Sequence, residues 1–419
     1  MKIVNLNDLK EDFFEKIEFE NITSVSEIIA DVRENGDSAL IKYSKQFGDG
    51  DLETIELSEK EIIDSLKSID MDTLEALNFA IKNVRDFAQK QLSCLKNLDT
   101  TIGKTQIGHR LIPVEKVGCY IPGGNYPLMS SAVMTIVPAK VAGVKEIVAI
   151  SPKIHPYVIA ACKLSGADRI FRIGGVQGIA ALAHSTESVP KVDKIVGPGN
   201  KYVTAAKKQV FGECGIDFLA GPSEVLIIAD DSANPEFVAA DMLAQCEHDI
   251  DARAYLICFS KQFAQKVDKK AKEFLKTLKT KEIAEISYQK STAVVVTSLK
   301  EAIELSNKKA PEHLEICFKD AKNYMDEFTN YGSLFIGSYS AEVFGDYVSG
   351  TNHTLPTNQV SRYNAGLSVF DFVKVQTYQV IAKENAPQIA LNASILADKE
   401  GLYAHKLAAD LRLNEKSPN

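Results

Sequence analysis

The chain has 419 residues, of which 45% are hydrophobic and 25% charged, and its formal net charge is -8 at pH 7. This length predicts two or more domains, and the composition is that of a soluble globular protein. The acidic balance, without a dense Lys/Arg patch among aromatic residues, argues against a nucleic-acid partner. No apolar run approaches the length of a membrane span, so no membrane association is expected.

The N-terminus and the cysteines indicate where the protein is found. Residues 1–20 are acidic and of mixed polarity, unlike a signal peptide. The seven cysteines are scattered and form no CxxC pair. This usage is typical of a reducing compartment, so we expect a cytoplasmic protein without a disulfide framework.

The N-terminal region, residues 1–105, is predicted to be helical. Apolar residues recur at helical spacing over residues 24–47 and 58–95. Ser58 and Glu61 have the spacing of a capping box at the start of the second stretch. The region has no glycine-rich loop and no histidine, so we expect it to contribute structure rather than chemistry.

From Val114 onward the pattern changes to short apolar runs that alternate with helical stretches. Such alternation predicts mostly parallel sheets covered by helices on both faces. The strands are too many for one sheet, so the predicted fold class is α/β with two Rossmann-like lobes, at residues 106–230 and 231–360. Residues 361–419 return to a helical pattern and are expected to form a C-terminal tail. The predicted strands are residues 117–121, 146–151, 169–173, 194–196, 225–229, 255–259, 293–296, 314–318 and 333–336.

Three glycine-rich turns connect predicted strands to helices in the first lobe, at residues 118–125, 173–177 and 196–201. Turns of this kind let the backbone approach a phosphate at a helix N-terminus. None has the G-x-G-x-x-G spacing, so a nucleotide site is compatible with them but a dinucleotide site does not follow. Tight turns without a ligand are the alternative. Cys119, beside the first turn, could be a nucleophile, but a cysteine in an apolar strand is more often a small buried hydrophobe.

Two motifs in the second lobe carry groups suited to catalysis or metal binding. Asn234 and Pro235 begin a helix on which Gln245 and His248 lie three residues apart, so both could reach one metal ion. Glu312 and His313 follow Pro311, and both residue types are common general bases. Solvent-facing helix-end and loop positions are the respective alternatives. The second pair precedes a strand, whereas ligands in open α/β sheets usually bind beyond the carboxyl ends of strands.

Two further stretches carry polar groups that could converge on the same place. Residues 345–357 are almost entirely polar, small or turn-forming and include Asp346 and His353. Loops with such residues on a rigid scaffold often carry binding chemistry, although a solvated turn is the alternative. Near the C-terminus, Glu400 and His405 lie in the helical tail, either on its surface or on an arm that reaches a neighbouring chain.

In this order, these segments resemble the histidinol dehydrogenase family over most of the chain, from about residue 114 to residue 412. The resemblance implies a cytoplasmic, zinc-dependent homodimer that uses two NAD molecules and one water. It would oxidise L-histidinol through L-histidinal to L-histidine, the last step of histidine biosynthesis. The segments that carry the resemblance are residues 118–127, 197–203, 221–230, 245–248, 310–316, 345–357 and 400–405.

The resemblance also implies roles for individual residues, with one zinc ion per subunit and active sites shared between subunits. Glu312 and His313 would be the catalytic bases, and His353 receives no role. NAD would contact Tyr120, Gln177 and Asn200. The metal ligands would be Gln245, His248, Asp346 and His405, the last from the partner subunit. The substrate would contact these four ligands, His313, Ser223 and Glu400.

The residue types agree with this chemistry but do not exclude other functions. An amide oxygen, a carboxylate and imidazoles suit zinc. Zinc beside a glutamate also suits water activation, so a metal-dependent hydrolase is the main alternative; the three glycine turns favour a nucleotide enzyme. A non-catalytic α/β binding protein is a further alternative.

Overall fold

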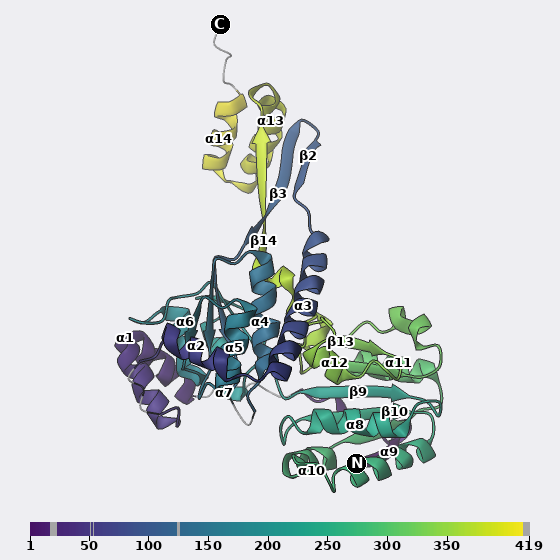
Figure 1. Cartoon of the computed structure of the whole chain (residues 1–419). Helices are drawn as coiled ribbons and strands as arrows, with labels where there is room; N and C mark the ends of the chain where they lie inside the picture. The colour runs from purple at the N-terminus through teal and green to yellow at the C-terminus, as the bar shows by residue number, and fades with distance from the viewer. Residues whose placement is uncertain (17–22, 51, 53, 124–125, 414–419) are drawn as a thin grey trace. The chain divides into compact units, whose positions relative to one another are not determined.

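The computed structural model describes residues 1–16, 23–50, 52, 54–123 and 126–413 (Figure 1). The first glycine-rich turn is therefore described only in part, because residues 124 and 125 lie outside these ranges. The chain divides into two compact units. The first unit comprises Met1–Gln91 and Val114–Phe372, and the second comprises Leu92–Pro113 and Val373–Asn419.

The first lobe of the first unit contains a parallel five-stranded sheet with the order β6-β5-β4-β7-β8. Helices α4 and α5 pack together, and α6 packs with α7. In Figure 1 this sheet is flanked by helices, as the alternating sequence pattern predicts. The order reverses direction at β4, so β4 and β7 flank the switch point where α/β folds bind ligands. The strands are β4 (Lys116–Tyr120), β5 (Glu146–Ile150), β6 (Arg169–Phe171), β7 (Lys194–Val196) and β8 (Gly215–Ile216), and the helices are α4 (Met129–Ala142), α5 (Pro156–Ser165), α6 (Gly175–His184) and α7 (Lys201–Val210).

The second lobe contains a parallel six-stranded sheet with the order β1-β11-β10-β9-β12-β13. Alternate residues of β9 enter two separate apolar cores, Val225 and Ile227 on the face that α8 covers, and Leu226 and Ile228 on the face that α11 covers. The strands are β1 (Lys2–Asn5), β9 (Glu224–Ala229), β10 (Arg253–Cys258), β11 (Thr292–Val295), β12 (His313–Cys317) and β13 (Ser333–Ile336). The helices are α8 (Pro235–Cys246), α9 (Lys261–Phe274), α10 (Lys281–Gln289), α11 (Leu299–Lys309) and α12 (Glu342–Tyr347).

In the N-terminal region, the predicted helical stretch at residues 24–47 forms α1 (Thr23–Gln46), and the stretch at residues 58–95 is divided into α2 (Glu59–Ser68) and α3 (Met71–Ser93). Helix α1 packs against α6, and α2 packs against α5. The capping box is confirmed, since the Ser58 side chain accepts the Glu61 N–H and the Glu61 side chain accepts the Ser58 N–H. The region is not wholly helical, because β1 adds an edge strand to the second lobe. Four residues are too few to give a strand pattern without their pairing partner.

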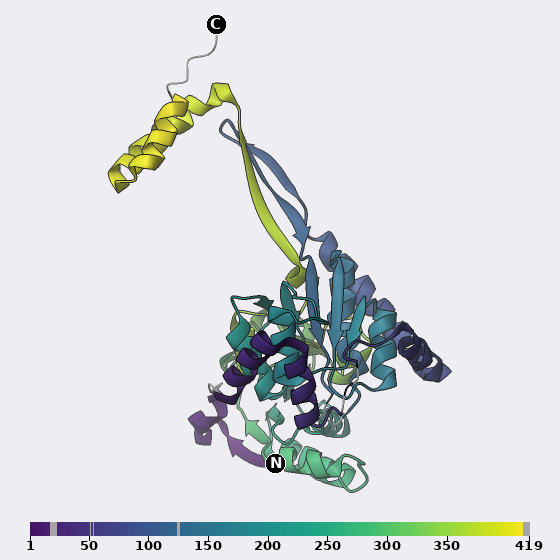
Figure 2. The same cartoon turned by 90° about the vertical axis from the view of Figure 1, so that its left-hand side faces the viewer.

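The second unit consists of a three-stranded antiparallel sheet and a helix pair (Figure 2). Its strands are β2 (Leu98–Ile102), β3 (Thr105–Pro113) and β14 (Val373–Ile381), and its helices are α13 (Ala386–Glu400) and α14 (Tyr403–Leu413). The helical prediction for the C-terminal tail is confirmed for α13 and α14 but was wrong for β14. Most β14 residues are exposed or half-buried, so no apolar run marked the strand.

The predicted α/β class with two Rossmann-like lobes is confirmed. Among the described residues, no helix combines the length and apolar character needed to cross a membrane.

Candidate active site

The most buried group of predicted site residues lies at the amino ends of β9 and β12. Leu314 and Ile316 of β12 enter the core beneath α11, so the alternate residues His313 and Glu315 face α8. Helix α8 follows β9 and returns antiparallel to the strands, which brings its C-terminal turns to this amino edge. Asp241 of α8 accordingly hydrogen-bonds to Glu315. The position of Glu312 and His313 before a strand is thus explained by a site at the amino edge.

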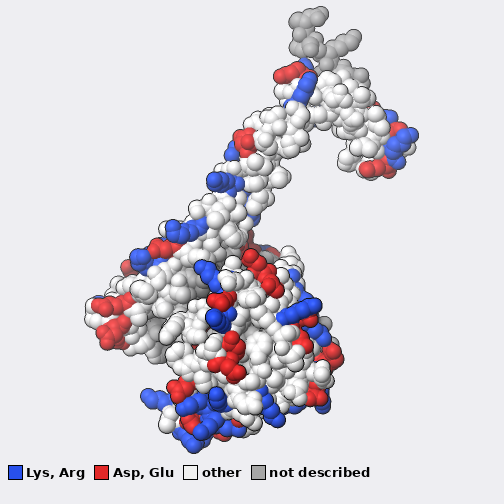
Figure 3. Space-filling model, turned by 90° about the vertical axis from the view of Figure 1, so that its right-hand side faces the viewer, with Lys and Arg blue, Asp and Glu red and all other residues white. Residues whose placement is uncertain are grey.

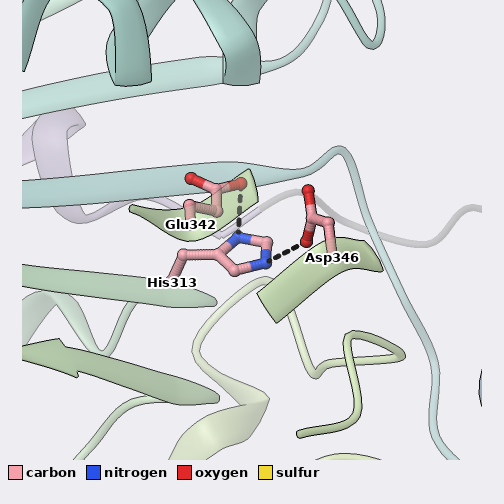
Figure 4. Close-up of side chains that lie close together, drawn as sticks. All are labelled: His313, Glu342 and Asp346. Carbon is pink, nitrogen blue, oxygen red and sulfur yellow. Dashed lines mark ion pairs between the residues drawn. The ribbon is translucent and has the colours of Figure 1, made fainter. Parts of the chain in front are cut away.

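His313 is buried, and its ring lies between the carboxylates of Glu342 and Asp346 (Figure 4). Its Nδ1 lies 3.2 Å from the Glu224 carbonyl oxygen and 3.3 Å from Glu342 Oε1. Its Nε2 lies 3.8 Å from Asp346 Oδ1 and has no hydrogen-bond partner among the described residues. Two oxygens beside Nδ1 favour the tautomer with the proton on Nδ1, which leaves the Nε2 lone pair available.

Burial lowers the pKa of the His313 imidazole to about 3, against the opposing effect of its hydrogen bond to Glu224. The nearby imidazoles of His248 and His353 lower this pKa further. His313 is therefore neutral around pH 7 and can accept a proton. His353, which the sequence left without a role, is thus placed in the electrostatic surroundings of His313.

Glu312 is buried beside His313, with its Oε2 3.7 Å from His313 Nδ1. The same oxygen accepts the Glu224 N–H at 2.9 Å, and Ser223 donates a side-chain hydrogen bond to the carboxylate. Burial raises the pKa of Glu312 well above its usual range, and these hydrogen bonds oppose the shift. Such a carboxyl is a stronger base than an exposed one once ionised.

Helix α12 presents Glu342 and Asp346, four residues apart, towards His313 (Figure 4). Glu315 Oε1 accepts the Glu342 N–H at 2.7 Å. A Cβ on Gly345 would come within 2.6 Å of the Phe335 ring, so glycine is needed for α12 to approach β13 this closely. One donor atom from each of His313, Glu342 and Asp346 lies within 4.8 Å of the others, a spacing that could hold a metal ion.

The carboxyl groups around His313 are crowded and buried. Burial raises the pKa of Asp346 to about 7 and that of Asp241 to about 6. Burial also raises the pKa of Glu342 well above its usual range, and the charges of Asp346 and Glu315 add to the effect. A cluster of carboxyls with so little cationic compensation favours a bound cation.

Gln245 and His248 are the predicted metal ligands from α8. Gln245 lies four residues after Asp241, so the two residues share the face of α8 on which Asp241 meets Glu315. Gln245 is fully buried, yet neither atom of its amide has a hydrogen-bond partner among the described residues. His248 follows α8 with an exposed side chain, close enough to His313 to affect its pKa. Because buried amides are almost always hydrogen-bonded, the unpartnered Gln245 fits a residue that binds a ligand or metal ion.

Glu400 and His405 lie in the second unit, where both side chains are exposed. The structure therefore brings together Ser223, Gln245, His248, Glu312, His313 and Asp346, all in the first unit. It does not place Glu400 and His405 relative to them.

The predicted NAD contacts lie at the carboxyl edge of the first-lobe sheet. Tyr120 ends β4, and its hydroxyl accepts the Gly175 N–H at 3.3 Å. Gly197, after β7, has a φ of +116° and lies so close that a Cβ would come within 2.2 Å of the Tyr120 carbonyl oxygen. The two strands that flank the switch point thus end in close contact.

Gln177 and Asn200 lie at the N-terminal ends of α6 and α7. Gln177 is buried in α6, and its Oε1 has no hydrogen-bond partner among the described residues. Asn200 is the N-cap of α7, where its Oδ1 accepts the N–H groups of Tyr202 at 3.0 Å and Val203 at 3.1 Å. The Asn200 side chain therefore shapes the turn itself, and its amide nitrogen is the group left for a ligand.

Cys119 behaves as a small buried hydrophobe. It is fully buried in β4, and burial raises the pKa of its thiol to about 12. A group that stays protonated at neutral pH is a poor nucleophile.

Several residues of the cluster were absent from the sequence prediction, namely Glu224, Asp241, Glu315 and Glu342. Glu315 left a signal, because it is a carboxylate inside an otherwise apolar strand. Glu342 gave a weaker signal: it lies four residues before Asp346, a spacing that places both on one face of a helix. Glu224 and Asp241 join the cluster only through β9–β12 pairing and the packing of α8, which a single sequence does not display.

Comparisons with known proteins agree over nearly the full chain. A family model described as histidinol dehydrogenase matches residues 15–413. Histidinol dehydrogenase of Methanocaldococcus jannaschii is 44% identical over 98% of this chain and 95% of that protein, and the Aquifex aeolicus protein is 44% identical over 96% and 94%. The crystal structure of histidinol dehydrogenase from Elizabethkingia anophelis matches with a TM-score of 0.93 and 36% identity, over 99% of this chain and 98% of that chain. The chain therefore belongs to the histidinol dehydrogenase family.

Proposed function

We propose that this chain catalyses the NAD-dependent oxidation of L-histidinol through L-histidinal to L-histidine, as the last step of histidine biosynthesis. The observation that carries the proposal is the neutral, buried His313, whose Nε2 has no partner among the described residues, next to a cluster of carboxyls and the unpartnered Gln245 amide. Membership of the family supplies the substrate.

Gln245, His248 and Asp346 would hold one zinc ion in each subunit, with His405 contributed by the partner subunit. The donor set fits, since a buried amide oxygen, a carboxylate and imidazoles are ligands that zinc accepts. When bound, zinc would act mainly as a template for the amine and imidazole nitrogens of histidinol. Ser223 and Glu400 would complete the substrate contacts.

His313 and Glu312 would act as bases at successive steps. His313 Nε2 takes the proton of the substrate hydroxyl during oxidation of the alcohol, because Nδ1 is already directed at the Glu224 carbonyl. Glu312 takes a proton from the water that hydrates the aldehyde, since its carboxylate lies beside Ser223 and His313. NAD, when bound, accepts one hydride in each oxidation.

Tyr120, Gln177 and Asn200 would bind NAD at the carboxyl edge of the first lobe. The switch point between β4 and β7 supports this position, because ligands of doubly wound sheets bind there. Residues 106–230 would thus form the NAD side and residues 231–360 the metal side.

Residues 361–419 would reach the partner subunit in a homodimer. Helices α13 and α14 bury small residues, Ala390, Ala397 and Ala409, but expose large apolar ones. The side of the second unit that faces the viewer in Figure 3 is mostly uncharged. An apolar surface of this kind is typical of a protein interface. The exposed apolar residues are Leu391, Ile395, Leu396, Leu407 and Leu411 on the helices and Leu98, Ile102, Val375 and Val380 on the strands.

We also propose that the enzyme works in the cytoplasm. Cys119, Cys162, Cys214, Cys246, Cys258 and Cys317 are buried free thiols, which is the usual state of cysteines in a reducing compartment.

The direct test mixes the purified protein with zinc, NAD and L-histidinol and follows NADH absorbance and L-histidine formation. Two NADH should form for each histidine, and His313→Asn protein should form far less. Zinc-dependent hydrolysis without NADH would favour the hydrolase alternative. Ligand binding without any turnover would favour a binding protein.

A further inference from the structure

A buried ion pair lies behind the two bases. Lys309 Nζ, at the end of α11, is 3.1 Å from Glu224 Oε2, and both side chains are less than a tenth exposed. Lys309 also donates to the Phe13 carbonyl at 3.1 Å and to the Tyr255 hydroxyl at 3.4 Å. The mechanism proposed above assigns no role to Lys309 or to the Glu224 side chain.

The main chain of Glu224 contacts both bases. Its N–H donates to Glu312 Oε2 at 2.9 Å, and its carbonyl oxygen lies 3.2 Å from His313 Nδ1. Glu224 therefore helps to orient the Glu312 carboxylate and, together with Glu342 Oε1 at 3.3 Å from Nδ1, favours one tautomer of the His313 imidazole.

The ion pair and the His313 side chain lie on opposite faces of the sheet. Leu226 and Ile228 of β9 face α11, so Glu224, two residues before Leu226, directs its side chain to that face as well. His313 faces α8, on the side of the candidate metal ligands. The ion pair is thus separated from the His313 imidazole by the sheet and reaches it through the main chain of Glu224. The Glu224 carboxylate also acts on Glu312 directly, because its charge adds to the rise in the pKa of Glu312.

A contribution to stability alone does not explain why the protein buries this ion pair. Burying two charges removes them from water, and apolar side chains of similar volume are often as stabilising as a buried ion pair. A buried pair is better suited to specifying one position of the groups that it anchors.

We propose that the Lys309–Glu224 ion pair is a positioning element for the two bases. The ion pair anchors Glu224, the first residue of β9, from the α11 face. This keeps the Glu224 carbonyl in place to accept the His313 Nδ1–H, which leaves Nε2 available, and it keeps the Glu224 N–H donating to Glu312 Oε2. This inference rests on the proposed function, because it assigns His313 and Glu312 their roles as bases.

The main test is the double variant Lys309→Met with Glu224→Gln, which removes both charges and nearly preserves side-chain volume. Its kcat should fall about 10- to 100-fold, as for a small misplacement of catalytic groups, while KM for histidinol changes little. The single variant Lys309→Arg keeps the charge at this position and should retain most of the wild-type kcat. Tyr255→Phe is the matched control, because it removes a contact of Lys309 but leaves the ion pair, and it should keep the wild-type kcat.

A second readout is independent of turnover. Nitrogen NMR of histidine-labelled protein reports the tautomer of each imidazole, and the His313 signal is identified by its loss in His313→Asn. Wild-type protein should show His313 protonated on Nδ1, and the double variant should show a mixture of tautomers. A purely structural role would lower the thermal midpoint without this change.

A folded double variant with the wild-type kcat and the wild-type His313 tautomer would overturn the inference. Should the double variant not fold, Glu224→Asp takes its place, because it keeps both charges but shortens the acid by one methylene. The same fall in kcat and shift in tautomer are then expected, and wild-type values again overturn the inference. Wild-type protein that does not oxidise histidinol would instead defeat the proposed function, while the tautomer measurement still decides whether the pair holds His313.

Discussion

At the scale of single residues, burial decides what His313 and Glu312 can do. The pKa of an exposed histidine is about two units higher than that of an exposed glutamate. In this site burial reverses the order. Burial disfavours the charged form of each, so it lowers the pKa of His313 to about 3 and raises that of Glu312 well above its usual range. His313 is therefore neutral at pH 7, whereas Glu312 holds its proton to a higher pH than an exposed glutamate and acts as a base once it is ionised.

We predict that Glu312→Gln impairs oxidation of the aldehyde more than oxidation of the alcohol. Only the second step requires an activated water, and a general base typically contributes about 100- to 10,000-fold to such a step. His313→Asn should impair both steps. The measurement is steady-state NADH formation from histidinol and from histidinal in separate assays. Equal slowing of the two steps by Glu312→Gln would show that the division between the bases is wrong.

Zinc binding should distinguish the two sets of candidate ligands. If Gln245, His248 and Asp346 hold the ion, His248→Ala should weaken zinc binding by at least about 10-fold, given that even indirect partners of a metal contribute this much. Glu342→Gln should then have a smaller effect. The measurement is zinc content after dialysis against a graded chelator, with Gln177→Ala as a control from the first lobe. A larger loss for Glu342→Gln would instead support the His313, Glu342 and Asp346 set.

At the scale of elements, the start of α2 is fixed by short-range hydrogen bonds and one long-range ion pair. The Ser58 hydroxyl and N–H both donate to Glu61 Oε2, and Arg172 of the first lobe lies 2.5 Å from Glu61 Oε1. The helix is therefore capped locally and attached to the lobe by the same carboxylate.

This carboxylate predicts a pH-dependent contribution to stability. Its hydrogen bonds with Ser58 and then with Arg172 lower the pKa of Glu61 from 4.5 to about 2. A pKa that is lower in the folded state means that the stabilisation is complete above pH 4.5 and is lost as the pH falls towards 2. Glu61→Gln should therefore reduce the free energy of unfolding at pH 7 more than at pH 3, as measured by urea unfolding.

Ser58→Ala and Glu59→Gln serve as comparisons in the same helix. Ser58→Ala removes the cap and should destabilise by about 1 kcal/mol. Glu59→Gln removes a charge from the same first turn but leaves the capping box, so it should change stability little. If it matched Glu61→Gln at both pH values, the effect would belong to charge in the first turn and not to the capping box.

At the scale of the whole molecule, the predicted metal ligands are divided between the two units of the chain. Gln245, His248 and Asp346 belong to the first unit, whereas His405 belongs to the second. The second unit also exposes large apolar side chains on α13 and α14. These two features motivate the proposal that the tail completes the active site of a partner subunit.

Subunit mixing tests this arrangement. We predict that inactive His405→Asn and Gln245→Ala chains regain activity when their subunits exchange. In each mixed dimer one site then carries both changes and the other carries neither, so activity should approach about half that of wild type under two-fold symmetry. Each variant mixed with itself is the control. Exchange without recovery, together with His405 located beside Gln245 of its own chain, would show that the tail completes its own site.

The sequence by itself predicted much of the local structure and a set of candidate site residues. Alternating apolar runs and helical stretches predicted two α/β lobes, and Ser58 with Glu61 predicted a cap that the structure contains. These features depend on neighbours a few residues away, which a single sequence displays. Ser223, Gln245, His248, Glu312, His313 and Asp346 came from the motifs and their resemblance to a family, and the structure gathers them in one unit.

Tertiary structure alone decided how these residues meet. Pairing of β12 with β9 brings Glu224 to both Glu312 and His313, and the return of α8 brings Asp241 to Glu315. Strand β1 and the exposed ribbon of β2, β3 and β14 likewise exist only through partners distant in the chain. Because long-range pairing and burial set these contacts and the resulting pKa shifts, residue types and their spacing were insufficient to predict them.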